Sequence, residues 1–421
     1  VTTGIENTFI GGLAGDALTD ADYNTAVGKS ALGADTLGSR STAIGYGALT
    51  LQNFTTATDT YNTAVGYQAG LYVTTGINNT LIGATAGDAI TTGQQNTAVG
   101  RASLGATTTA NNNTAMGYYA LTTNTTAADN TAFGASALSA NTTGSANTAV
   151  GKGAGLSVTT GVQNTLIGGL AGDALTDADY NVVVGGEALT LDTLGSRSVA
   201  IGRAALAAQN FTTATDTYNT AVGNNAGLSV TTGVQNTLIG GLAGDALTDA
   251  DYNVAIGYSA LSNDTLGSKS VAVGHNNLAS QNFTTATNSF NTAIGHGAGL
   301  AVTTGVQNTL IGALAGDALT DADYNVAVGY ACLTADTLGS RTVAMGYGAL
   351  STQNFTTATA SYNVGIGFQA GNAVTTGTQN TFIGGLAGDS ITTGGNNVAL
   401  GYNALISDTQ GTGSTAVGKQ S

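Results

Sequence analysis

The sequence predicts an all-β fold, a parallel β-solenoid (β-roll) of about 24 coils with a 17-residue step. The first observation is a phrase that recurs 24 times: Asn, then Thr or Val, a small residue, a larger apolar residue and Gly. The second is its spacing, which is 17 residues except for four steps of 21 that begin at Ser41, Ser198, Ser270 and Thr342. The third is the absence of helical apolar spacing in a chain rich in Gly, Thr and Asn, which are poor helix formers. Self-similarity at a fixed short period is typical of a solenoid.

A longer repeat lies above the short one. Phrases at Asn164, Asn236, Asn308 and Asn380 are 72 residues apart, and the 21-residue segments that begin at Gly161, Gly233 and Gly305 are nearly identical. Duplication of a four-coil block explains this pattern. We therefore expect one continuous repeat domain over residues 1–421, which forms a segment of a longer fibre protein.

Composition limits the partners. Charged residues make up 8% of the chain and the net charge is −15, so no basic patch is available to neutralise the phosphates of nucleic acid. No apolar run approaches the ~18 residues of a membrane span, and we expect no membrane insertion. The single Cys332 replaces the Ala of position eight in most coils, which indicates a small buried residue rather than a reactive thiol.

Each coil is numbered here from its Asn as position one. Positions two and four accept apolar residues, so we expect a strand that turns this face inward, with position four buried at Val65, Ile167, Ile256 and Val328. Gly occupies position five in all 24 coils, which indicates a positive φ or a close neighbour. Position three, mostly Ala, is then expected on the outside. Because a 17-residue coil encloses little, we expect this face to pack between chains in a homotrimeric rod about 115 Å long.

The phrases SVAIG at Ser198, SVAVG at Ser270 and TVAMG at Thr342 resemble the head repeats of trimeric autotransporter adhesins. The phrases NTAVGYQAG at Asn62 and NTAIGHGAG at Asn291 are similar to repeat shafts of bacteriophage tail fibres. The resemblance covers essentially the whole chain. It implies a trimeric β-roll that acts as a spacer or as a binding surface.

The residue before each Asn forms a column in which a cation alternates with aromatic residues. We expect Arg197 within about 6 Å of the rings of Tyr180 and Tyr218, as a structural cation–π ladder or, alternatively, a ligand site. On the preceding coil, an Asp one position earlier in the repeat could pair with the cation; this Asp is Asp22 or its equivalent Asp179, Asp251 or Asp323.

Two groups of side chains are candidate metal ligands. Asp173, Asp177 and Asp179 recur in each block, and clustered carboxylates suit Ca²⁺, although a solvated acidic stripe is the alternative. His275 and His296 both fall at position six of adjacent coils and could hold a transition metal, or simply face solvent.

Two further features concern glycans. Tyr330, Tyr347 and Phe368 stand in a row at position six and could form a platform for sugar rings, or pack as ordinary strand-surface residues. The four long coils each insert QNFTTAT, expected as an outward loop. The Asn of each insert is a glycosylation acceptor if the source secretes and glycosylates the protein. The four residues are Asn53, Asn210, Asn282 and Asn354.

These observations favour a structural shaft or receptor-binding fibre of an extracellular appendage or virion, most simply a phage tail fibre. A microbial cell-surface adhesin or a self-assembling extracellular filament is the alternative. A polysaccharide-cleaving tailspike and an ice-binding solenoid are less favoured, because no pair of carboxylates is singled out and Val interrupts the Thr column from Val182 onward. We expect no enzyme activity, no cofactor other than Ca²⁺, and a cell-surface glycan or receptor as partner.

Overall fold

The computed structural model describes all 421 residues and confirms the parallel β-solenoid of about 24 turns. It holds 32 strands and no helix. A three-residue strand spans positions two to four of every coil, and equivalent positions pair in parallel in successive coils, as in Thr63↔Thr80, Ala64↔Leu81 and Val65↔Ile82. Backbone hydrogen bonds therefore run from coil to coil.

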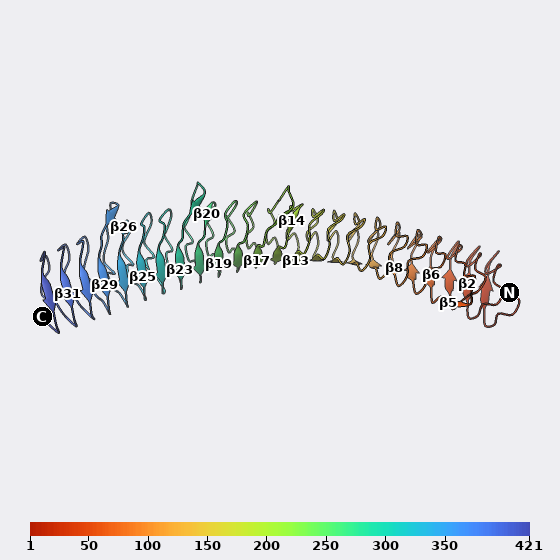
Figure 1. The fold of residues 1–421 in the computed structure, drawn as a ribbon, viewed down its shortest axis with the longest axis horizontal. Coiled ribbons are helices and arrows are strands. Elements are labelled where there is room, and N and C mark those ends of the chain that lie inside the picture. Colours follow the sequence, from red (N-terminus) through yellow and green to blue (C-terminus); the bar gives the residue numbers. More distant parts are fainter. The chain divides into compact units, whose positions relative to one another are not determined.

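The chain forms two compact units, Val1–Asp216 and Thr217–Ser421 (Figure 1). The main strands of the first unit are β1 (Thr8–Ile10), β2 (Thr25–Val27), β4 (Thr42–Ile44), β6 (Thr63–Val65), β7 (Thr80–Ile82), β8 (Thr97–Val99), β9 (Thr114–Met116), β10 (Thr131–Phe133), β11 (Thr148–Val150), β12 (Thr165–Ile167), β13 (Val182–Val184) and β15 (Val199–Ile201). Those of the second unit are β17 (Thr220–Val222), β18 (Thr237–Ile239), β19 (Val254–Ile256), β21 (Val271–Val273), β23 (Thr292–Ile294), β24 (Thr309–Ile311), β25 (Val326–Val328), β27 (Val343–Met345), β29 (Val364–Ile366), β30 (Thr381–Ile383), β31 (Val398–Leu400) and β32 (Thr415–Val417).

Short two-residue strands accompany the long coils. They pair in parallel as β3 (Gly38–Ser39) with β5 (Thr58–Asp59), β14 (Gly195–Ser196) with β16 (Thr215–Asp216), β20 (Gly267–Ser268) with β22 (Thr287–Asn288), and β26 (Gly339–Ser340) with β28 (Thr359–Ala360). In Figure 1 the chain protrudes beyond the neighbouring coils near β14, β20 and β26.

The inward and outward faces of the strands are the reverse of those predicted. Position three is buried in every coil except the first, where Phe9 is half-buried. Position four lies outside: Val65, Ile256 and Val328 are half-buried and Ile167 is 37% exposed. Alternation along a strand shows that positions two and four share a face, but it does not show which face points inward when both are apolar. The narrow interior of a 17-residue coil takes Ala at position three in most coils, and Leu or Phe only where position nine is Gly. The larger side chain that every position four carries therefore lies outside.

The coils fill their interior in two alternative ways, which differ at positions nine and twelve. Where position nine is Leu, position twelve is polar, and where position nine is Gly, position twelve is Val, Ile or Leu. The geometry explains this pairing. A Cβ added to Gly316 would lie 2.8 Å from Leu319 Cδ1 and 2.8 Å from Leu310 Cδ2. A side chain at position nine and an aliphatic one at position twelve therefore compete for the same volume, which interiors at crystal-like density do not provide.

The Gly at position five is required by both of the constraints anticipated for it. Gly66 has φ +141°, and a Cβ there would lie 2.5 Å from the carbonyl oxygen of Gly83 in the next coil. Any other residue would meet backbone that cannot move without breaking the stack.

The Asn at position one forms a buried ladder. Asn62 donates from Nδ2 to the carbonyl of Gly76 at 2.7 Å, and its Oδ1 accepts the backbone N–H of Asn79 at 2.9 Å. Asn79 repeats this arrangement with Gly93 and Asn96. Each amide thus satisfies backbone groups both of its own coil and of the next, as buried polar groups require.

Candidate functional site

In four places, the residue that precedes position one is a cation whose neighbours in the adjacent coils are aromatic. The Arg40 guanidinium lies 4.9 Å from the ring centroid of Tyr23 and 5.9 Å from that of Tyr61. All three residues have φ between 51° and 62°, so the same backbone conformation points each side chain outward. Stacking of equivalent positions at one coil spacing therefore builds the ladder.

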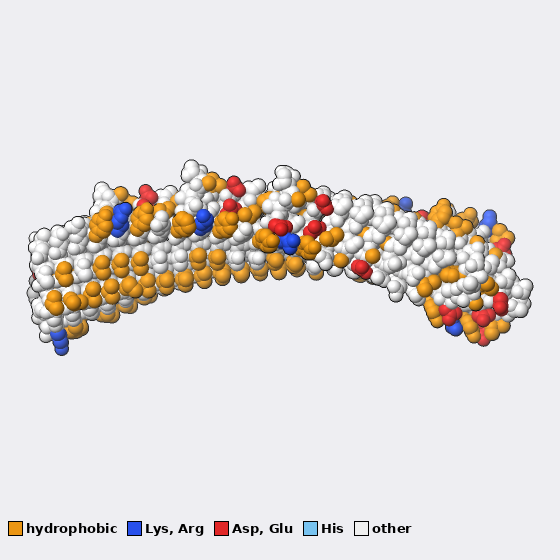
Figure 2. Space-filling view, viewed as in Figure 1, with side chains coloured by type: hydrophobic (Ala, Val, Ile, Leu, Met, Phe, Trp, Pro, Cys, Tyr) orange, Lys and Arg blue, Asp and Glu red, His pale blue; other side chains and the backbone are white.

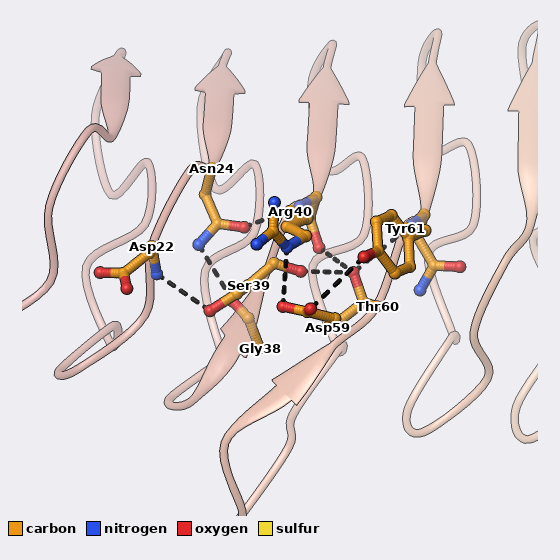
Figure 3. A network of polar contacts seen from close by, with 10 residues as sticks. Asp22, Asn24, Gly38, Ser39, Arg40, Asp59, Thr60 and Tyr61 are labelled. Carbon is orange, nitrogen blue, oxygen red and sulfur yellow. Dashed lines mark hydrogen bonds and ion pairs between the residues drawn. The ribbon is translucent and has the colours of Figure 1, made fainter.

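The ion pair of this ladder differs from the one predicted. Arg40 Nε lies 2.9 Å from Oδ1 of Asp59, and this contact raises the pKa of the guanidinium (Figure 3). Asp22 instead accepts the backbone N–H of Ile5 through Oδ1. The partner directly follows the inserted QNFTTAT segment of the long coil, and the repeat pattern did not reveal where this part of the chain lies relative to the cation.

Equivalent ladders occur in the other blocks. Arg341 lies 5.1 Å from the ring of Tyr324 and 5.9 Å from that of Tyr362. Lys269 lies 6.0 Å and 5.3 Å from the rings of Tyr252 and Phe290.

In the first unit, Arg197 lies 4.8 Å from the ring of Tyr180 and forms an ion pair with Asp216 at 2.9 Å. Tyr218 belongs to the second unit, and its distance from Arg197 stays a prediction.

The aspartates proposed for Ca²⁺ have separate partners in neighbouring coils. Asp173 Oδ1 accepts the Thr190 hydroxyl at 2.5 Å. Asp177 Oδ1 accepts the Thr160 hydroxyl at 2.5 Å, and Asp179 Oδ1 accepts the Val162 N–H at 2.7 Å. The structure brings no three His, Cys, Asp or Glu side chains together around one point. Binding of Ca²⁺ stays an untested prediction.

The two histidines belong to a stack of exposed rings. The rings of His275 and His296 lie 5.2 Å apart with an interplanar angle of 3°, and Tyr258 stacks on His275 at 5.6 Å. Their arrangement is that of neighbouring position-six side chains on adjacent coils. Metal binding there also stays a prediction.

The aromatic row at position six is a stack rather than a flat platform. Tyr330 and Tyr347 are 5.4 Å apart, as are Tyr347 and Phe368, with interplanar angles of 16° and 13°. Each ring covers the face of its neighbour, and about half of each side chain is exposed. The ring edges are consequently directed to solvent. A sugar ring that stacks face to face would find only the outer faces of Tyr330 and Phe368.

The inserted QNFTTAT segments are anchored, and only part of each is a loop. Asn53, Asn210, Asn282 and Asn354 are exposed, as a glycosylation acceptor must be. The following Phe is buried, with 5–6% exposure at Phe54, Phe211, Phe283 and Phe355. The outward-loop prediction is therefore wrong for this Phe, because its ring is held against the coil.

A buried acid anchors each insert, and the sequence analysis did not find it. Asp336 accepts the Gln353 side-chain amide at 2.6 Å and the backbone N–H groups of Gly339 and Phe355 at 3.0 Å each. Gln353 also donates to Thr342 and accepts from Asn363. Burial outweighs these hydrogen bonds and raises the pKa of Asp336.

The same Asp–Gln pair recurs as Asp35 with Gln52, Asp192 with Gln209 and Asp264 with Gln281. Each pair accompanies Ser or Thr in place of Asn at position one. The Gln side chain bridges this residue and the next Asn: Gln52 donates to the Ser41 hydroxyl and accepts from Asn62 Nδ2, while the Thr60 hydroxyl accepts the backbone N–H of Asn62. That coincidence of an Asp, a Gln and a missing Asn was the available sequence signal.

Cys332 is fully buried, and its thiol lies 3.1 Å from the carbonyl oxygen of Gly329. Burial raises the pKa of the thiol to about 12, so the thiolate is not populated near neutral pH. The prediction of a small buried residue is confirmed.

No protein-family model matches this chain, and no curated protein matches it. The structure contains no helix with the length and apolar character needed to cross a membrane.

Proposed function

We propose that this chain is the structural shaft of an extracellular fibre and that three copies assemble side by side through positions two and four. The observation that carries the proposal is the outward face of the main strands. Position two is Thr or Val and position four is Val, Ile, Leu, Met or Phe in all 24 coils.

This apolar face has no partner within the chain. Its position-four side chains include Ile44 at 38%, Phe133 at 53%, Ile239 at 36% and Leu400 at 44% exposure. Figure 2 shows hydrophobic side chains in continuous rows along the part that holds Thr217–Ser421. Apolar patches that extend beyond a few hundred Å² on a protein surface mark interaction sites.

Symmetry favours a closed assembly of parallel copies. Because the apolar face repeats at every coil, parallel copies in register place each face against an equivalent one along the whole length. Cyclic symmetry about an axis along the coils closes such an assembly without leaving an apolar edge. Three copies are proposed on the resemblance to phage tail-fibre shafts and autotransporter heads. The corrected orientation moves the contact from position three to position four.

The molar mass in solution tests the assembly. Light scattering is expected to give about three times 41.1 kDa for the full chain. Replacing two position-four residues of the apolar face together, Ile256→Asn with Ile311→Asn, should lower the mass toward that of one chain. The matched control is Tyr72→Asn, which changes a 51% exposed residue outside the apolar face of positions two and four. A folded wild-type monomer at all concentrations, or dissociation by the control alone, would refute the proposal.

The fibre role has its own test. Electron microscopy of the native source, with an antibody against the chain, should label a thin appendage on a virion or a cell surface. Labelling of virions would support a tail fibre, whereas labelling of cells would support the adhesin or filament. Labelling confined to the cell interior would refute an extracellular fibre.

A further inference from the structure

The surface column at position six holds an unusual share of the positive charge. The chain has nine Lys and Arg residues, of which four belong to the ladders described above. The remaining five all occupy position six: Lys29, Arg101, Lys152, Arg203 and Lys419. On a chain of net charge −15, this column is therefore where an anion finds its cationic partners.

The column is open at a place that lies between two of these cations. Between Lys152 and Arg203, position six is Gly in two successive coils, at Gly169 and Gly186. A Cβ added to Gly169 would meet nothing within 4 Å, and one added to Gly186 would meet only a carbonyl oxygen at 3.9 Å. At Gly241, by contrast, the ring of Tyr258 from the next coil lies 3.6 Å from the Cβ position and covers the gap.

The opening is a notch of about 430 Å³, which is within the range of small-molecule sites. Lys152, Gly169, Leu170, Gly186, Glu187 and Arg203 line it. Leu170 is 41% exposed and supplies an apolar wall beside the two glycines. The two cations are three coils apart, which is about 14 Å at the spacing of paired strands.

The electrostatics leave the cations available. Glu187 forms an ion pair with Arg203 at 3.3 Å, and the two side chains are 53% and 66% exposed. A guanidinium has five N–H donors, so one contact with Glu187 leaves others free for a ligand carboxylate. The Glu187 carboxylate in turn can accept a hydrogen bond from a ligand hydroxyl. No acidic residue lines the Lys152 end of the notch.

We propose that this notch binds an acidic saccharide, a disaccharide of uronic acid type with a carboxylate on each ring. The two ends supply cations for two carboxylates, Leu170 and the glycine backbone supply a surface for the C–H face of a sugar, and Glu187 accepts a ring hydroxyl. A lone inorganic anion would contact one end and leave most of the volume unused. The site stands whether or not the chain assembles into a fibre.

The test is a calorimetric titration of the full chain with digalacturonate at low and at physiological ionic strength. Binding should weaken as salt rises, because exposed charges are screened. Cellobiose, which is neutral, should not bind. Acetate should not compete at equal carboxylate concentration. Competition by acetate would indicate a simple anion site and would overturn the saccharide.

Variants locate the site. Lys152→Ala and Arg203→Ala should each weaken binding about tenfold, the loss of one hydrogen bond between charged groups. Gly169→Tyr should abolish binding without changing charge, because Tyr occupies position six in other coils and the added side chain meets open space. Lys29→Ala is the control for net charge and should leave affinity unchanged.

Melting curves of all variants should match that of the wild type, since every changed residue is exposed. No heat from digalacturonate with the wild type, or full affinity in Gly169→Tyr, would overturn the proposal.

Discussion

Leu310 and Ile311 are neighbours in β24 that face opposite sides of the wall of the coil. Leu310 is 0% exposed and Ile311 is 36% exposed. Leu310 packs over two glycines: the Cβ positions of Gly299 and Gly316 lie 2.7 Å and 2.8 Å from its two terminal carbons. Because glycine has no side chain, nothing at these two positions can fill the space left when Leu310 is truncated, so the cavity stays open. Leu310→Ala should therefore cost about 4 kcal/mol, near the upper end for such changes.

Ile311→Ala is the matched control. It removes three carbons that are about two thirds buried, which amounts to roughly 1.5 kcal/mol at about 0.8 kcal/mol per carbon. The two variants should therefore differ by about 2.5 kcal/mol. Urea unfolding measures the difference, and hydrogen exchange in β23 and β25 detects a loss that stays local in a one-dimensional stack.

A compensated variant tests the cause. The coil from Asn96 has Ala98, Leu104 and Thr107 at positions three, nine and twelve. Leu310→Ala with Gly316→Leu and Leu319→Thr reproduces that set, and Leu is tolerated at positive φ at position nine, as Leu333 shows with φ 55°. This triple variant should recover at least half of the loss.

Protein concentration separates the core from the proposed interface. The loss of unfolding free energy in Leu310→Ala should not depend on protein concentration. The loss in Ile311→Ala should rise at concentrations where chains associate. The orientation would be refuted if Ile311→Ala were as costly as Leu310→Ala at every concentration. It would equally be refuted if Leu310→Ala cost under about 1 kcal/mol.

Three further changes probe the backbone, the Asn ladder and the buried acid. Gly66→Ala places a methyl group against the carbonyl of the next coil, so it should lower the free energy of unfolding in urea by more than about 3 kcal/mol. Gly169→Ala, in open space, should lower it by under about 1 kcal/mol. Equal losses would contradict the close approach at Gly66. Asn79→Ala leaves the carbonyl of Gly93 and the N–H of Asn96 unpaired and should cost about 2–4 kcal/mol; unchanged exchange of the Asn96 amide would exclude the ladder role. For Asp336, the folded-state pKa is raised, so its charge destabilises the fold above that pKa and the penalty disappears as pH falls toward about 3.9. Relative to Asp336→Asn, the wild type should gain stability on acidification from neutral pH, and a relative loss would show that hydrogen bonding outweighs burial.

Several features could be read from the sequence because they depend only on the repeat. Parallel stacking in register at a 17-residue step determines which residues become neighbours. The stacks of Tyr23, Arg40 and Tyr61 and of Tyr330, Tyr347 and Phe368 follow from it without knowledge of the coil's cross-section. The need for Gly at position five also follows, since a residue that never varies across 24 coils indicates a backbone constraint.

The direction in which each side chain points, and the contacts made across a coil, were decided by the tertiary structure. A strand with apolar residues on both faces has two possible orientations, and the limited volume inside the closed coil turns the face that carries mostly Ala inward. The contact between Asp336 and Gln353 joins residues 17 apart at position twelve, where the pattern alternates between aliphatic and polar residues. The meaning of that alternation depends on whether position nine carries a side chain, because both positions draw on one small volume. Shared volume is a property of the closed coil, which the linear repeat does not contain.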